Sequence, residues 1–319
     1  MDVSDTALEG AAETAVKQCL AVASGEAFVV VTDDERRSIG ERLYRAGREV
    51  TDDAVFVQYP PGPQHGAEPP KAVAAAMRDA DVFVAPTTKS LSHTRARSAA
   101  CENGARGATM PGITEEVLVA GLDADYAAIA DHCEAVYEQV SDADEVRVTT
   151  DTGTDITFEP GDREWLSDTG LVHEPGGFSN LPAGEVFVSP ETAHGTYVVD
   201  GTMMPHGLVD HELRFEVEDG YVTDISDDAV RDQVEDGAES VGRDAYNLAE
   251  LGIGTNVGVS ELVGSVLLDE KAAGTVHIAI GDDASIGGET EAPLHLDGII
   301  REPTVYADGE VVDLPTVER

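Results

Sequence analysis

Four residues in the last third of the chain carry side chains that commonly bind divalent cations. Glu250 stands in A-E-L-G-I-G-T-N, His277 in G-T-V-H-I-A-I-G, and His295 and Asp297 in H-L-D-G. Imidazole nitrogens and carboxylate oxygens are ordinary protein ligands of zinc, manganese and non-haem iron. The segment therefore contains a possible donor set for a metal site.

Two expected strands would bring these donors together. In V-H-I-A-I, apolar residues alternate with His277 and Ala279, which is the period of a half-buried strand. His295 and Asp297 are two residues apart, so both leave the same side of an extended backbone. A single histidine on a strand is more often structural, and an H-x-D pair is a weak motif by itself. The apolar, glycine-flanked setting favours a metal site, because unpaired charge is costly there.

A fifth candidate ligand, Glu185, lies in N-L-P-A-G-E-V-F-V-S-P-E. On an extended backbone Glu185 and Phe187 share one face, and the valines between and after them take the other. The preceding glycine permits close approach of backbone or ligand. Taken alone, this segment is typical of an ordinary edge strand.

The first half of the chain alternates expected strands with expected helices. Helical spacing covers 3–22, 35–50, 70–80 and 123–140, and apolar runs predict strands at 27–32, 54–59, 81–86 and 107–111. A further helix is expected in S-L-S-H-T-R-A-R, beginning at a serine cap, with His93 in its first turns. This alternation is typical of a parallel α/β sheet. No glycine-rich phosphate loop follows these strands, so no nucleotide site is predicted.

From residue 145 the pattern becomes one of alternating polar and apolar residues. It predicts a hairpin over 145–159 and strands at 185–189, 196–201, 211–217 and 221–225, while 227–250 has a helical composition. We therefore predict an α/β domain with a mainly parallel sheet over 1–144. An α+β metal-binding domain with mainly antiparallel strands is predicted over 145–319.

The charge of the chain excludes several classes of partner. The sequence has 63 acidic and 20 basic residues, a formal net charge of −43. Repulsion at this density disfavours nucleic acid and anionic membranes as partners. The acids are spread through periodic segments, which indicates a halophile's folded protein rather than a disordered chain. No apolar run approaches the roughly 18 residues of a membrane span. The start M-D-V-S-D lacks signal-peptide features, so a cytoplasmic location is expected.

Taken together, four motifs resemble the M29 metallopeptidases, the aminopeptidase T family. They are P-A-G-E-V-F, A-E-L-G-I-G-T-N, D-E-K-A-A-G-T-V-H-I-A-I-G and H-L-D, in that order. The resemblance is strong over 180–297 and looser before it, and suggests a short archaeal-type member. It implies a homodimeric aminopeptidase, a hydrolase that removes N-terminal residues from peptide substrates. It also implies two divalent ions of the zinc, cobalt or manganese type. Their implied ligands are Glu185, Glu250, His277, His295 and Asp297, with Glu250 as the bridging, catalytic carboxylate.

The sequence departs from that family at Ala284, where full-length members carry a tyrosine, and its loop before H-x-D is shorter. A second interpretation is the related branch of 2,5-dihydroxypyridine dioxygenases. His277, His295 and Asp297 match the ligand set of non-haem iron oxygenases. One Fe(II) ion is then expected, with the glutamates around its ligands and His93 as a substrate-binding residue and base. A third interpretation is a non-catalytic protein that binds a metal or a small molecule.

We predict that the melting temperature rises between about 0.1 M and 1 M KCl, because the screening length falls from about 10 Å to 3 Å over this range. Screening relieves repulsion among the 63 acidic residues. Thermal unfolding followed by circular dichroism measures the effect. A melting temperature that stays flat or falls would contradict the halophile interpretation.

Overall fold

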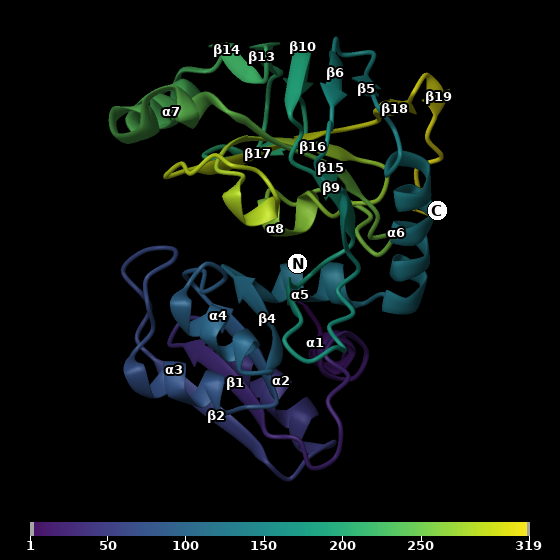
Figure 1. Cartoon of the computed structure of the whole chain (residues 1–319). Helices are drawn as coiled ribbons and strands as arrows, with labels where there is room; N and C mark the ends of the chain where they lie inside the picture. The colour runs from purple at the N-terminus through teal and green to yellow at the C-terminus, as the bar shows by residue number, and fades with distance from the viewer. Residues whose placement is uncertain (1–2, 318–319) are drawn as a thin grey trace. The chain divides into compact units, whose positions relative to one another are not determined.

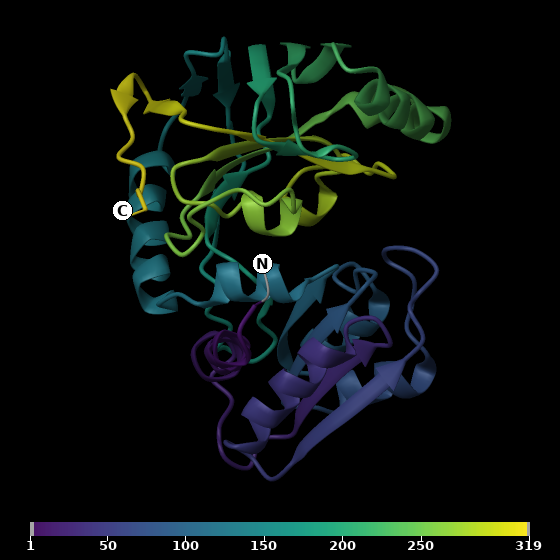
Figure 2. The ribbon, with the colours of Figure 1, turned by 180° about the vertical axis from the view of Figure 1, so that it is seen from behind.

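A computed structural model describes residues 3–317, which form two compact units (Figures 1 and 2). The first unit contains residues up to Ala130 together with Thr169–Ala183. The second contains Asp131–Asp168 and the chain from Gly184 onward. The predicted fold class, a parallel α/β part followed by an antiparallel α+β part, is confirmed.

The first unit is built on a five-stranded parallel sheet in the order β2-β1-β3-β4-β8. Its strands are β1 (Phe28–Asp33), β2 (Ala54–Tyr59), β3 (Val82–Thr87), β4 (Arg106–Pro111) and β8 (Phe178–Asn180). The central strands β1 and β3 are buried along their whole length, as the continuous apolar runs F-V-V-V and V-F-V-A require. The short strand β8 is an addition that the sequence pattern did not predict.

Helices accompany this sheet, one before β1 and one after each of its first four strands along the chain. They are α1 (Asp5–Glu13), α2 (Arg37–Arg48), α3 (Lys71–Arg78), α4 (Arg95–Glu102) and α5 (Glu115–Leu122). The chain passes into the second unit within α6 (Tyr126–Val140). The helix expected over 3–22 is α1 followed by a π-helical turn, η1 (Thr14–Cys19). Across residues 3–317, every helix is too short or too polar to span a lipid bilayer.

The serine cap predicted for α4 is wrong. The cap is Thr94, whose side chain accepts a hydrogen bond from the backbone N–H of Arg97 at 3.2 Å. Ser92 instead binds Thr109 and Asn180, with oxygen–oxygen distances of 2.7 and 2.8 Å. His93 therefore precedes the helix rather than lying in its first turn.

The second unit contains two seven-stranded sheets whose named strands all pair antiparallel. One sheet has the order β14 (Tyr221–Ile225), β13 (Leu213–Glu218), β10 (Thr192–Val199), β6 (Asp155–Glu159), β5 (Val146–Thr149), β18 (Thr304–Ala307) and β19 (Glu310–Val311). The other has the order β12 (Gly207–Leu208), β11 (Thr202–Met203), β17 (His295–Ile300), β16 (Val276–Gly281), β15 (Leu248–Gly254), β9 (Glu185–Val188) and β7 (Leu166–Asp168).

The helical prediction for 227–250 is wrong at its carboxyl end. Helix α7 covers Asp228–Val241 and ends at Gly242, whose φ of 67° is favourable for glycine alone. A 3₁₀ turn, η2 (Gly242–Tyr246), then leads into the buried strand β15. Glu250 consequently projects from a strand. Among the described residues, this unit also contains the short helix α8 (Val266–Asp269).

Candidate metal centre

Four neighbouring strands, β9, β15, β16 and β17, carry the candidate ligands (Figure 1). On one neighbouring strand each candidate lies opposite a glycine or an alanine, although on the other neighbour His277 faces Ile299 and Glu185 faces Asp168. The register pairs Glu185 with Gly254, His277 with Gly252, Glu250 and Asp297 with Ala279, and His295 with Gly281. Residues directly opposite in an antiparallel pair have Cβ atoms only about 5 Å apart. The small residues therefore leave the space that the functional side chains fill.

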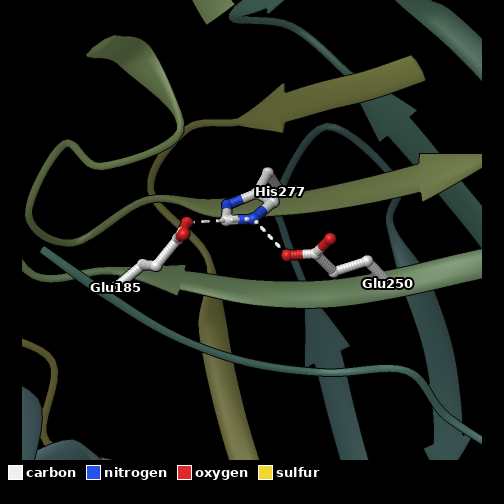
Figure 3. Close-up of side chains that lie close together, drawn as sticks. All are labelled: Glu185, Glu250 and His277. Atoms are coloured by element: carbon white, nitrogen blue, oxygen red, sulfur yellow. Dashed lines mark hydrogen bonds and ion pairs between the residues drawn. The ribbon is translucent and has the colours of Figure 1, made fainter. Parts of the chain in front are cut away.

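Contacts link all five candidates into one cluster, and Glu250 is at its centre. The two carboxylate oxygens of Glu250 lie 3.2 Å from Nε2 of His277 and 3.3 Å from Nε2 of His295. Glu185 Oε2 is 3.5 Å from Nε2 of His277, and Asp297 Oδ1 is 3.3 Å from Nε2 of His295. Figure 3 shows the imidazole of His277 between the two glutamates. Both imidazoles thus present Nε2 to carboxylates.

Gly252 makes room for the buried imidazole. A Cβ atom at this position would collide with the ring of His277, which lies over strand β15. The histidine side chain is 1% exposed. Its orientation is therefore enforced by packing as well as by its contacts with the glutamates.

A backbone hydrogen bond fixes the tautomer of the second imidazole. Nδ1 of His295 lies 2.7 Å from the carbonyl oxygen of Asp282, which can only accept, so Nδ1 carries the proton. In the neutral imidazole the lone pair on Nε2 is then the one available to a metal ion, as is usual for histidine ligands. The His295 side chain is 34% exposed, so solvent reaches the cluster on this side.

The loop between the two histidine strands is held by a buried carboxylate. Asp283 accepts hydrogen bonds from Asn247 Nδ2 at 2.9 Å, Ser189 Oγ at 3.0 Å and the backbone N–H of Thr290 at 2.7 Å. The next residue, Ala284, is exposed at the start of a 3₁₀ turn. This position, where the aminopeptidase resemblance expects a tyrosine, therefore supplies no phenol.

Charge coupling sets the protonation of the cluster. Burial alone would raise the pKa of Glu250, but its hydrogen bonds with His277 and His295 hold that pKa well below its usual range. Burial alone would lower the pKa of His277, but Glu250 and Glu185 raise it to about 9. Similarly, Asp297 and Glu250 outweigh burial and raise the pKa of His295. The carboxylates therefore stabilise protons on the two imidazoles. A bound dication would supply positive charge in place of those protons.

The donor set fits a divalent cation. Two groups have ligand atoms within 4.8 Å of one another: Glu185, Glu250 and His277, and Glu250, His295 and Asp297. Oε2 of Glu185 and Nδ1 of His277 are buried without a hydrogen-bond partner. Such orphaned polar atoms are rare, and a carboxylate oxygen without a donor suits a cation neighbour. The assignment of these residues as ligands stays a prediction.

The remaining predicted site residue, His93, belongs to the first unit. Its side chain is exposed between the buried residues Ser92 and Thr94, just before α4. Its assignment to the substrate also stays a prediction.

The neighbouring pair Glu270 and Lys271 also lies at the cluster, although the sequence motifs predict no role for either residue. Nζ of Lys271 contacts Glu185 and lies 2.7 Å from Oε1 of Glu270. A signal was present, because Lys271 is one of only four lysines and immediately precedes the apolar segment A-A-G-T-V-H.

The sequence of this chain is similar to those of known dioxygenases. A sequence model of the NicX family, described as 2,5-dihydroxypyridine 5,6-dioxygenase, matches residues 9–315. A curated 2,5-dihydroxypyridine 5,6-dioxygenase from Pseudomonas putida KT2440 is 25% identical over 183 residues, 53% of this chain and 52% of that protein. The alignment thus spans about half the length of this relative.

Solved structures extend the likeness to almost the whole chain. The 2,5-dihydroxypyridine dioxygenase of Pseudomonas putida KT2440 has a TM-score of 0.79 and 21% identity, over 97% of this chain and 96% of that one. AmpT from Thermus thermophilus has a TM-score of 0.67 and 17% identity, over 97% and 99%. The fold expected from the M29 resemblance is therefore confirmed.

The enzyme type expected from that resemblance is wrong. The family match, the curated relative and the first of these structures are all dioxygenases. The comparisons therefore contradict the assignments as an aminopeptidase, a protease and a hydrolase. The resemblance failed here because a fold and a donor set can serve more than one chemistry.

Replacing Gly252 by alanine should weaken metal binding by about 10–100-fold, the range observed when the groups that orient a metal ligand are altered. The added methyl group would displace the His277 ring, with which its Cβ collides. Calorimetric titration of metal-free protein with Co(II) measures the affinity. The matched control is Gly10→Ala in α1, where a Cβ meets nothing within 4 Å. Wild-type affinity in a folded Gly252→Ala protein would show that the ring position does not matter.

Proposed function

Because the chain belongs to the 2,5-dihydroxypyridine 5,6-dioxygenase family, we propose that it is a ring-cleaving dioxygenase. Its proposed substrates are dihydroxylated pyridines and dioxygen, and its proposed cofactor is one Fe(II) ion. The match over residues 9–315 supports this function, since it includes every candidate ligand. Both oxygen atoms of dioxygen would enter the product as the bond between ring carbons 5 and 6 is broken.

The observation that carries the proposal is the set of two imidazoles and one carboxylate on adjacent strands. His277 projects from β16, and His295 and Asp297 project from β17. Two histidines and one carboxylate form the ligand set of non-haem Fe(II) oxygenases, which leaves positions open for substrates. These three residues would hold the ion, and the ion would supply the redox chemistry by which dioxygen reacts with the ring.

Other groups of the chain would orient the two imidazoles and control access to the site. Glu250 contacts both imidazoles and keeps their Nε2 atoms turned toward one place. The carbonyl of Asp282 holds the tautomer of His295 in which Nε2 is free to bind. The burial of His277 keeps water from that side of the centre, while the exposed edge of His295 gives the substrate access.

Oxygen-electrode measurements test this function directly. Protein loaded anaerobically with Fe(II) in molar salt should consume dioxygen when 2,5-dihydroxypyridine is added. Asp297→Ala and His295→Ala should each lose more than about 100-fold of this rate, because even residues that only support a metal ligand cost about 10–100-fold. His211→Gln is the matched control, since His211 is 57% exposed and pairs with Asp210 outside the cluster. No dioxygen uptake by iron-loaded wild type, across a panel of dihydroxypyridines, would refute the proposal.

We also propose that His93 is the base on the substrate side, since it is solvent-exposed and histidine is the most common general base. His93→Gln should lower kcat by about 100-fold or more, which is the usual contribution of a general base. Its iron content should equal that of wild type, because His93 is outside the ligand cluster. Steady-state kinetics paired with iron analysis separates the two effects. An unchanged kcat would remove His93 from the mechanism.

A further inference from the structure

A buried ammonium group lies beside one end of the metal cluster. Lys271 is 4% exposed, and its Nζ contacts Oε1 of Glu185 and lies 2.7 Å from Oε1 of Glu270. Two buried carboxylates around one lysine provide the compensation that a buried charge requires. The cluster therefore already contains one cation that is covalently part of the chain.

Backbone contacts fix the position of Lys271. Strand β15 ends at Gly254, where a Cβ would collide with the backbone of Lys271 and Ala272. The carbonyl oxygen of Lys271 accepts a hydrogen bond from the backbone N–H of Asn256 at 2.8 Å. The backbone N–H of Lys271 donates to the carbonyl oxygen of Leu268 at 3.0 Å. The lysine is thus fixed at both backbone groups, which limits where its side chain can reach.

The ammonium group lies at only one of the two donor groups. The cluster contains Glu185 with Glu250 and His277, and separately Glu250 with His295 and Asp297. Glu250 belongs to both groups, and a carboxylate shared in this way is typical of sites that bind two metal ions. Lys271 contacts Glu185, which belongs to the first group alone, and so one oxygen of that carboxylate already has a cationic partner.

We propose that Lys271 takes the place of a second metal ion and limits the centre to one. Lys271 is in this sense a positioning residue: it neutralises Glu185 and repels a dication from that carboxylate. Nε2 of His277, which lies 3.2 Å from a carboxylate oxygen of the shared Glu250, would then serve the single ion together with His295 and Asp297. The inference rests on the proposed function, because it explains how a donor set sufficient for two ions serves one-iron chemistry.

Charge bookkeeping gives the expected behaviour of a lysine variant. The charges are counted with Glu185, Glu250, Glu270 and Asp297 all ionised, as they would be beside a bound dication. With one dication and Lys271 present, these four carboxylates retain a net charge of about −1, with both histidines neutral as metal ligands. Without the ammonium group, one dication leaves about −2, and a second dication cancels that charge. Removal of Lys271 should therefore open the second position.

The test is a count of bound ions in the full-length chain. Metal-free protein is titrated with Mn(II) in molar KCl, with free Mn(II) followed by electron paramagnetic resonance and bound metal by elemental analysis. Wild type should bind one ion per chain, and Lys271→Met and Lys271→Gln should each bind two. Lys271→Arg, which keeps the charge, should bind one. In the double variant Lys271→Met with Glu185→Gln, the second ion should be lost again.

The number of bound ions decides whether Lys271 replaces a second metal ion. Two ions or none on wild type would overturn it, and so would a single ion on folded Lys271→Met and Lys271→Gln. Failure of both variants to fold in saturating Mn(II) would also count against it, because the second ion should supply the missing charge. The readout is independent of turnover. Wild type that binds one ion but consumes no dioxygen would contradict the proposed function and leave this inference standing.

Discussion

Negative charge buried on one face of a sheet is the constraint on which the site depends. Glu185, Glu250 and Asp297 are each less than 10% exposed, and removal of carboxylates from water is costly unless cations accompany them. The two imidazoles provide cationic partners for Glu250, and the ammonium group of Lys271 provides one for Glu185. The small residues opposite each ligand and the braced loop before His295 keep these groups within contact distance.

This constraint explains why related folds support different reactions. A sheet that gathers two imidazoles and several carboxylates will bind dications, but the number of ions and the open positions determine the chemistry. The aminopeptidase resemblance rested on ligand types and order, which both interpretations share. Ala284, exposed where a tyrosine was expected, and Lys271, paired with Glu185, are the local features that favour the one-iron interpretation.

Much of the site was predictable because its residues follow strand periodicity. The two-residue spacing of His295 and Asp297 places both on one face, and alternation in V-H-I-A-I defines strand β16. Glu250 was placed in a helix because the preceding residues favour one, and only the turn at Gly242 ends it. The role of Lys271 was not predictable from periodicity, since its partner Glu185 lies on a strand far away in sequence. Likewise, β8 is three residues long and is stabilised by pairing with β4 rather than by its own sequence.

The most direct test of the one-iron centre is a crystal structure of the Fe(II)-loaded protein with diffraction recorded at the iron absorption edge. The anomalous map should contain one strong peak per chain, coordinated by His277, His295 and Asp297, with the ammonium group of Lys271 still beside Glu185. Two peaks about 3.5–4 Å apart, the spacing of two-metal sites, would contradict the account. A single peak bound by Glu185 instead of Asp297 would contradict it equally.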